Sequence, residues 1–155
     1  MILISDTREA LPLVFSKIEG VEYRTEGLSV GDYTARYKDG KMSDTIWERK
    51  SLPDIFLSFT GKNYERERKK MLRYKECGFE KYILAIEATV FEIRTGYHYR
   101  KDGQEHWAKK DGLSMIRQIM TCMRKYGIIP WFFSSKEEMA FTIQEYFLTY
   151  ERVKV

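Results

Sequence analysis

The stretch "TIWERKSLPDIF", residues 45–56, places three charged residues between two apolar segments. Glu48, Arg49 and Lys50 follow an apolar pair and precede the apolar run 55–57. In an extended strand, successive side chains alternate between the two faces of a sheet. We therefore expect Glu48 and Lys50 on one face and Arg49 on the other. This spacing makes an acid and a base neighbours at the end of a buried strand.

The flanking sequence predicts that this strand belongs to a hairpin. Residues 28–37, "LSVGDYTARY", and 43–50, "SDTIWERK", read as strands, and Asp39-Gly40 between them is a strong turn signal. The hairpin would bring Asp32, where one strand starts, close to Glu48, where the other ends. We therefore expect two carboxylates at one end of the sheet.

Two carboxylates that lie this close repel each other unless a cation lies between them. Mg²⁺ or Mn²⁺, which prefer oxygen ligands, are the natural ions for such a site. Lys50 beside the ion suits phosphate chemistry, because an ammonium group offsets the charge that builds in the transition state. Asp54 is either the first-turn acid of a helix over 52–58 or a group that orients a water. Alone, the Glu-Arg-Lys triplet also fits a solvated strand edge.

The rest of the chain alternates strands with helices, which predicts an α/β sheet covered by helices on both faces. Apolar runs predict strands over residues 1–5, 81–88 and 128–133, and helical spacing predicts helices over 10–18, 63–77, 111–126 and 134–153.

Size and composition are those of a globular protein. We expect one domain over 1–155, since the chain has 43% apolar and 32% charged residues. A formal charge of +4 permits a polyanionic partner. No apolar run approaches the length of a membrane span, and we expect no membrane association and a cytoplasmic location. Cys77 and Cys122 have no metal-ligand spacing, so we expect reduced, buried thiols.

Taken together, these motifs resemble the XPF-type nuclease family of structure-specific DNA endonucleases. The resemblance rests on Gly31-Asp32, the spacer 33–47, Glu48-Arg49-Lys50 and Asp54, and it extends to "ISDTRE" and "DIFLSFTGKNYERERKKML". The similarity spans residues 2–147. It implies a restriction-endonuclease-like fold, with a mixed central sheet between helices, and a small single-domain prokaryotic or viral member of the family.

The resemblance also implies roles for individual residues. Asp32 and Glu48 would bind Mg²⁺ or Mn²⁺, with the main-chain carbonyl of Arg49 as a further ligand, and Lys50 would act on the attacking water. The acidic rim would be completed by Asp6, Glu9 and Asp54.

Cations after this motif are candidates for contact with DNA. Lys62, Arg66 and Lys70 lie in a basic helical segment, 62–75, and the resemblance places an Arg at position 66. A solvated helix with local ion pairs explains the same charges. Arg8 and Arg49 are further candidates.

The segment 95–110 mixes aromatic and basic residues. Tyr99, Arg100 and Trp107 suit stacking on bases and contact with phosphates. The alternative is a β-hairpin whose aromatic side chains pack on one another, with 101–103 as its turn.

The sequence thus predicts a metal-dependent DNA endonuclease that acts on branched or flap DNA in repair or recombination. A non-catalytic, nuclease-like module that binds DNA or pairs with an active partner is the alternative, and a related nuclease acting on RNA or Holliday junctions is a third. The sequence shows no helix-hairpin-helix module, so we expect a small DNA footprint.

We further expect a homodimer, formed through apolar residues on the last two helices. The alternative is that the long aromatic side chains wrap the edge of the core. The residues concerned are Met115, Ile119 and Met123 on one helix and Phe141, Tyr146, Phe147 and Tyr150 on the other.

Overall fold

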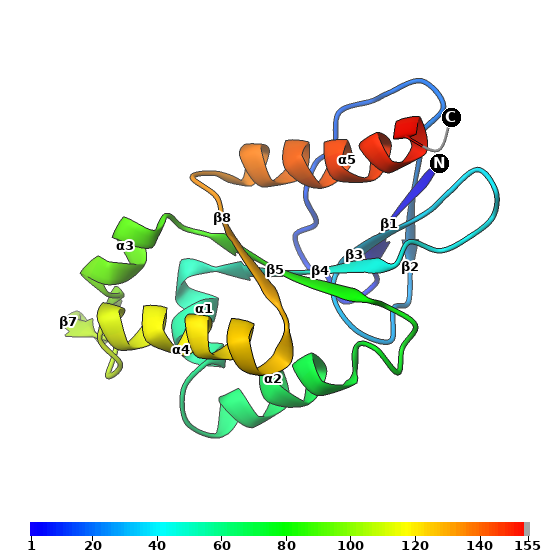
Figure 1. Cartoon of the computed structure of the whole chain (residues 1–155). Helices are drawn as coiled ribbons and strands as arrows, with labels where there is room; N and C mark the ends of the chain where they lie inside the picture. Colours follow the sequence, from blue (N-terminus) through cyan, green and yellow to red (C-terminus); the bar gives the residue numbers. More distant parts are fainter. Residues whose placement is uncertain (154–155) are drawn as a thin grey trace.

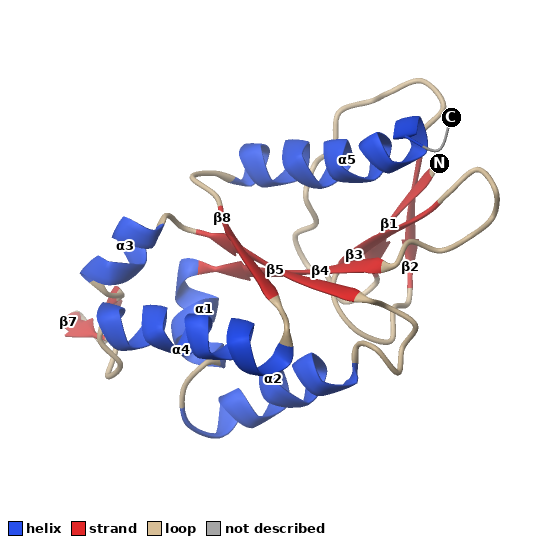
Figure 2. Ribbon diagram, in the orientation of Figure 1, coloured by secondary structure: helices blue, strands red, loops and turns tan. Residues whose placement is uncertain are grey.

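A mixed six-stranded sheet with helices on both faces forms the centre of the computed structural model, which describes residues 1–153 (Figures 1 and 2). The predicted fold class is therefore confirmed. The strands are β1 (Ile2–Asp6), β2 (Glu22–Glu26), β3 (Tyr33–Arg36), β4 (Thr45–Ser51), β5 (Lys81–Glu87), β6 (His98–Lys101), β7 (Gln104–Trp107) and β8 (Ile129–Phe132). The helices are α1 (Leu52–Ser58), α2 (Gly61–Arg73), α3 (Val90–Thr95), α4 (Gly112–Tyr126) and α5 (Lys136–Val153).

Strand β4 lies inside the sheet, whose order is β2-β1-β3-β4-β5-β8. It pairs antiparallel with β3 and parallel with β5, and the β4–β5 register runs from Thr45 opposite Lys81 to Ser51 opposite Glu87. The predicted hairpin of β3 and β4 is confirmed. Pairing with β3 is at Trp47, and pairing with β5 continues through Glu48, Arg49 and Lys50, so β5 fixes the backbone of the segment that carries the acid and the base.

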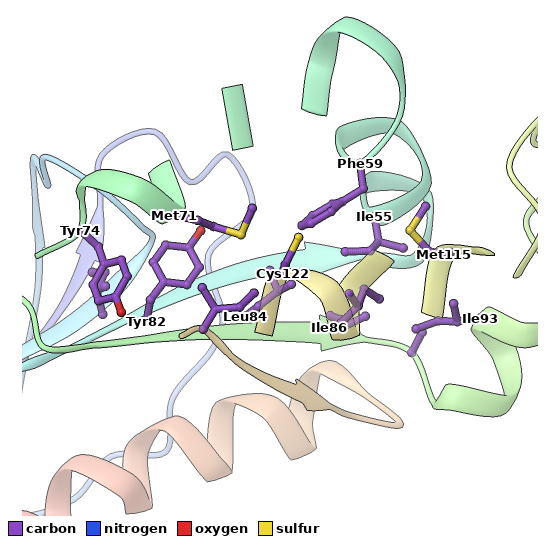
Figure 3. Packing of buried hydrophobic residues seen from close by; sticks show 14 of the residues in the cluster. Ile55, Phe59, Met71, Tyr74, Tyr82, Leu84, Ile86, Ile93, Met115 and Cys122 are labelled. Atoms are coloured by element: carbon purple, nitrogen blue, oxygen red, sulfur yellow. The ribbon is translucent and has the colours of Figure 1, made fainter. Parts of the chain in front are cut away.

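Two apolar cores lie on opposite faces of the sheet. Ile46 packs with residues of α1, α2 and α4 on one face (Figure 3), whereas Trp47 packs with residues of α5 on the other. The helices lie accordingly, with α5 on one side of the sheet and α1, α2 and α4 on the other (Figure 2). Each residue of β4 therefore belongs to one of two separate environments.

The helix predicted over residues 10–18 is wrong, because this segment is an irregular loop. Leu13 is buried against the α5 face while Val14 beside it is 90% exposed, and the Leu13 N–H donates to the hydroxyl of Tyr33. Pro12 restricts the residue before it to extended conformations and has no N–H of its own. The apolar residues thus pack from an extended loop.

The predicted strand over 28–37 is also only partly right. Residues 28–32 bend, and β3 starts at Tyr33. Gly31 has φ +73°, and a Cβ there would lie 2.3 Å from Cγ1 of Ile46, so only glycine fits this bend. Helix α2 begins and ends earlier than the predicted 63–77.

The segment 95–110 contains the hairpin that was one of the two alternatives. Strands β6 and β7 form a separate two-stranded sheet, and Asp102 and Gly103 turn with φ of 53° and 74°. Within residues 1–153, no helix has both the length and the apolar character needed to cross a membrane.

Candidate active site

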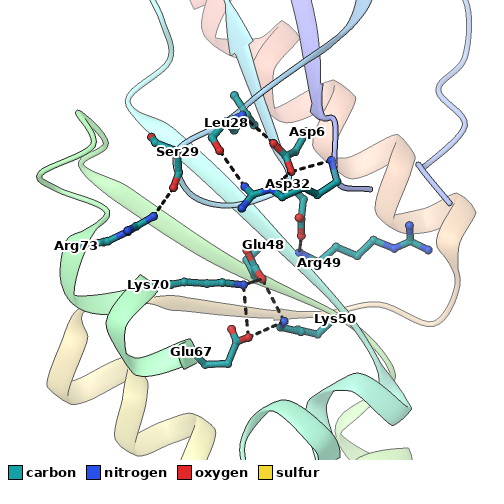
Figure 4. Close-up of polar contacts among 11 residues, drawn as sticks. Asp6, Leu28, Ser29, Asp32, Glu48, Arg49, Lys50, Glu67, Lys70 and Arg73 are labelled. Atoms are coloured by element: carbon teal, nitrogen blue, oxygen red, sulfur yellow. Dashed lines mark hydrogen bonds and ion pairs between the residues drawn. The ribbon is translucent and has the colours of Figure 1, made fainter. Parts of the chain in front are cut away.

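Glu48 and Lys50 lie side by side in a buried pocket between β4 and α2 (Figure 4). Glu48 is 2% exposed and Lys50 8%, and Lys50 Nζ lies 3.2 Å from Glu48 Oε1. From α2, Lys70 Nζ lies 2.8 Å from the same oxygen, and Glu67 Oε1 lies 3.0 Å from Lys50 Nζ. The predicted acid-base pair is therefore present, as part of a cluster of two carboxylates and two ammonium groups.

One oxygen of this cluster has no partner. Glu48 Oε2 is among the few buried side-chain atoms of residues 1–153 that make no hydrogen bond. An unpaired carboxylate oxygen away from water is costly, because nothing replaces its lost hydration. The pocket therefore offers a free, negatively charged ligand atom.

Asp32 lies against the same strand. Its Oδ2 accepts a hydrogen bond of 2.7 Å from the Arg49 N–H, and its own N–H donates to the Trp47 carbonyl at 2.8 Å. Burial, and next the negative charges of Glu48 and Glu9, raise the pKa of Asp32 to about 8. The ionised form of Asp32 therefore lacks sufficient positive charge around it.

These residues fit a divalent cation. The free oxygen of Glu48 and the uncompensated carboxylate of Asp32 are hard oxygen ligands. Residues 1–153 contain no cluster of three or more His, Cys, Asp or Glu side chains suited to a metal ion. Mg²⁺ commonly takes only one or two carboxylates and completes its shell with waters and substrate phosphates. Two carboxylates thus fit such an ion when the substrate supplies the remaining oxygens.

Lys50 is held as a cation. Burial by itself would lower its pKa, but the nearby carboxylates of Glu48 and Glu67 outweigh burial and raise the pKa above its ordinary value. The ammonium form donates hydrogen bonds and offsets negative charge, and it has no free lone pair for a proton.

The N-terminal acids form a neighbouring group. Asp6 is 1% exposed and accepts hydrogen bonds from Arg8 Nε at 2.6 Å and from the Leu28 N–H at 2.7 Å. Burial would raise the pKa of Asp6, but these hydrogen bonds lower it below its usual value. The hydrogen bond to Asp6, and further the charges of Asp32 and Glu48, raise the pKa of Arg8, so its exposed guanidinium lies beside the acidic pair.

Glu9 and Arg49 face each other on the α5 side of the sheet. Glu9 Oε2 accepts from the Tyr33 hydroxyl at 2.8 Å and lies 3.3 Å from Arg49 Nη1. Arg49 also donates to the Leu11 carbonyl and lies 3.6 Å from Glu87. Its side chain is 12% exposed. Arg49 therefore ties the N-terminal loop to β4 and has little surface to offer to a ligand.

The remaining predicted residues lie at the surface. Asp54 is exposed in the first turn of α1, where its N–H is capped by Ser51 Oγ at 3.2 Å, and its carboxylate has no partner within residues 1–153. Lys62 and Arg66 are exposed on α2, whereas Lys70 points into the pocket with 27% of its side chain exposed. These three cations of α2 therefore have different surroundings.

Glu67 is the site residue that sequence reasoning missed. It is 5% exposed and contacts both Lys50 and Lys70. A signal existed, because Glu67, Met71 and Tyr74 recur at helical spacing on the buried side of α2.

Tyr99, Arg100 and Trp107 all lie on the β6–β7 hairpin, but not on one face. Tyr99 stacks on His106 with ring centroids 5.5 Å apart, while Trp107 packs on His98 across the other face at 4.9 Å. Arg100 is exposed, with Glu105 3.9 Å away.

The sheet topology and the carboxylate-lysine site define a nuclease-type α/β fold, and the comparisons give the family. Residues 5–146 match the ERCC4 domain family, and the chain belongs to it. Among solved structures, XPF from Aeropyrum pernix superposes with a TM-score of 0.63 at 18% identity, over 94% of this chain and 62% of that one. The same protein in complex with DNA gives 0.61 at 19% identity, over 93% and 62%. The comparison with curated proteins found no match.

Proposed function

We propose that this protein is a metal-dependent DNA endonuclease that hydrolyses phosphodiester bonds in branched or flap DNA. The observation that supports it best is the unpaired Glu48 Oε2, on a carboxylate whose charge raises the pKa of Asp32, with the Lys50 ammonium 3.2 Å from the same carboxylate. This arrangement joins two metal ligands to a fixed positive charge. Membership of the ERCC4 domain family and the fold shared with a DNA-bound XPF add support.

Asp32 and Glu48 would hold the ion, with the Arg49 carbonyl as a further ligand. A bound Mg²⁺ or Mn²⁺ would supply Lewis acidity toward the scissile phosphate. Lys50 stays protonated, so it would hold the attacking water and offset the charge on the phosphate as one P–O bond forms and another breaks. Glu67 orients Lys50 through its 3.0 Å contact. Of the other predicted acids, Asp6 would neighbour the centre, whereas Glu9 pairs with Arg49 on the α5 side of the sheet and Asp54 lies at the surface of α1.

DNA would approach along exposed cations near this pocket. Arg8, held beside the acids by Asp6, and Arg66, exposed on α2, are suited to phosphate contacts. Arg49 is suited less well, since Glu9, Glu87 and Leu11 occupy its guanidinium.

The test is Glu48→Gln, which keeps the shape of the side chain and removes a ligand charge. Cleavage of a labelled flap substrate in Mg²⁺ should fall by about three orders of magnitude or more, while DNA binding persists. Glu76→Gln, which changes an exposed carboxylate in the turn after α2, is the matched control. Wild-type cleavage by Glu48→Gln would show that the site is assigned wrongly.

One observation favours the alternative of a non-catalytic module. The two ammonium groups on Glu48 Oε1 compensate the carboxylate without any metal. Such a module would bind flap DNA, show no Mn²⁺ binding by calorimetry, and leave every substrate uncut.

We also propose a homodimer, but through α5 alone. The predicted joint surface of the last two helices is wrong, because α4 and α5 lie on opposite faces of the sheet (Figure 1) and Met115, Ile119 and Phe147 are fully buried. The outer side of α5 exposes Phe141 by 64%, and this side borders an apolar hollow of about 490 Å³. A second copy of the same helix would cover this surface.

A further inference from the structure

A groove separate from the acidic pocket lies between the β6–β7 hairpin and the α1–α2 junction. Its volume is about 640 Å³, within the range of about 300–1,000 Å³ typical of ligand sites. Its apolar lining includes the rings of Phe56, Tyr97 and Tyr99. The hairpin, rather than the central sheet, therefore supplies one wall of this groove.

The aromatic rings beside this groove form one continuous stack. Phe56, which is 3% exposed, stacks on Tyr97 at 6.0 Å, and Tyr97 stacks on Tyr99 at 5.7 Å. Tyr99 in turn stacks on His106 at 5.5 Å. The stack thus begins in the core at α1 and reaches the surface at Tyr99, which is 37% exposed and stacks on both Tyr97 and His106. A ring fixed in this way offers its exposed part for contact with a base at little entropic cost.

The charged residues that line the groove are all cationic. Lys62 from α2, Arg100 from β6 and Lys109 after β7 line it, and none of the lining residues within 1–153 is acidic. Aromatic faces beside cations are the combination that binds single-stranded nucleic acid, because bases stack while phosphates meet the cations. Bases inside a duplex have both faces covered by neighbouring bases, so this groove suits unpaired nucleotides.

The position of the groove relates it to the acidic pocket. Helix α1 begins after its cap Ser51, which directly follows Lys50, and its last turn brings Leu57 to the groove. Its seven residues span about 10 Å, which is about three steps of 3.4 Å along a DNA strand. The groove therefore lies within a few nucleotides of the proposed cleavage centre.

We propose that this groove binds the unpaired nucleotides of a single-stranded DNA arm, with one base packed against the exposed part of Tyr99 and the phosphates of the arm on Lys62, Arg100 and Lys109. The proposal rests on the proposed endonuclease function for its choice of DNA. Binding of an unpaired arm in this groove would allow the protein to distinguish a flap or fork from a plain duplex.

Fluorescence anisotropy with EDTA present tests binding without cleavage. The probes are labelled dT₁₂, an abasic 12-mer of equal charge, and a blunt duplex. Wild-type protein should bind dT₁₂ about tenfold more tightly than the abasic strand. Tyr99→Ala should weaken dT₁₂ binding about tenfold and leave the other two probes unchanged, whereas Tyr99→Phe should retain the wild-type affinity. Phe91→Ala, a 76% exposed aromatic outside the groove, is the matched control.

A second variant lies outside the hairpin and does not depend on its folding. Lys62→Gln on α2 should reduce the slope of log affinity for dT₁₂ against log salt by about 0.7, and Lys41→Gln, exposed in the loop before β4, should not. The proposal would be overturned if Tyr99→Ala lost affinity equally for all three probes and if Lys62→Gln kept the wild-type slope of log affinity against log salt. If the groove proposal fails in this way but the wild type still cleaves flap DNA, the endonuclease function is retained. If binding depends on the bases but no substrate is cleaved, the groove proposal is retained and the endonuclease function is rejected.

Discussion

Glu48 has two oxygens in opposite situations, since Oε1 is shared by two ammonium groups and Oε2 has no partner. Lys50 comes from the same strand and is held by Glu67 as well, so it is fixed. Lys70 comes from α2, is 27% exposed and can withdraw toward solvent. Lys70 would therefore compete with the proposed divalent cation for Glu48.

Removing that competitor should strengthen metal binding. In Lys70→Ala, we expect Mn²⁺ affinity to rise about three- to tenfold, because one positive charge leaves the carboxylate that binds the ion. Titration calorimetry measures it. Lys69→Ala, exposed one residue earlier on α2, should bind Mn²⁺ as wild type does. Weaker binding by Lys70→Ala would mean that Lys70 supports the loaded site.

Asp32 should make the metal-free protein pH-sensitive. Its pKa is raised to about 8 in the fold, against about 3.9 in an unfolded chain. Between these values the folded state holds a proton that the unfolded state has released. The free energy of unfolding should therefore fall as pH rises from about 4 to 8. Asp32→Asn should flatten this dependence and be the more stable protein at pH 8.

Urea titrations in EDTA at pH 5.5 and 8 measure the effect, with Glu76→Gln as the control. An unchanged pH dependence in Asp32→Asn would contradict the raised pKa. The same proton must leave when a cation binds, so Mn²⁺ affinity should increase over this pH range in the wild type.

Sequence spacing was sufficient to bring together Asp32, Glu48 and Lys50, because strand alternation and one hairpin determine their positions. It was not sufficient for Glu67. The basic segment of α2 carries charges on more than one side, so the buried side becomes evident only once β4 and Lys50 are in place.

At the scale of elements, the well-predicted parts have strong local signals. Strand β5 is a continuous apolar run, and α4 ends at Gly127 in the left-handed conformation. Strand β2, "EYRTE", was missed because it is a polar edge strand that forms only by pairing with β1. The false helix at 10–18 has apolar residues whose burial depends on contact with the α5 core, which local spacing does not reveal.

The bend before β3, which precedes Asp32, should be sensitive to substitution at Gly31. Gly31→Ala adds a Cβ 2.3 Å from Ile46 Cγ1 in a backbone with φ +73°, and we expect a loss of about 2–4 kcal/mol in unfolding free energy. Gly40→Ala shares the positive φ but meets open space, so it should cost only about 1 kcal/mol. Urea unfolding of both variants separates the clash from the backbone strain. Equal losses would show that the bend relaxes.

In the whole molecule, the surfaces proposed to bind DNA and the surface proposed to form the dimer lie on opposite faces of the sheet. Helices α1 and α2, which contribute to the Glu48 site and to the groove, lie on one side of the sheet, whereas α5 lies on the other (Figure 2). A dimer through α5 would therefore leave both DNA-facing surfaces open.

Sedimentation equilibrium at micromolar concentration tests this assembly. Wild type should sediment as a dimer, with an interface of about 1,200 Å² or more, and Phe141→Glu as a monomer, because the new charge would be buried in the interface. Met123→Glu places the same charge on α4, where Met123 is 37% exposed, and should stay dimeric. The reverse pattern would assign the interface to α4, and a monomeric wild type would exclude the dimer.

The long parallel register of β4 on β5 has a consequence for folding fidelity. Because side chains alternate, a slip by one residue would turn Glu48 and Lys50 into the aromatic core under α5 and turn Trp47 toward the acids. Such a chain would bury unpaired charges and lose much of its apolar packing, so it would have no stable folded form. The proposed nuclease activity of a refolded sample would then be proportional to its content of correctly folded molecules, and misfolded chains would be degraded rather than persist as an inactive population.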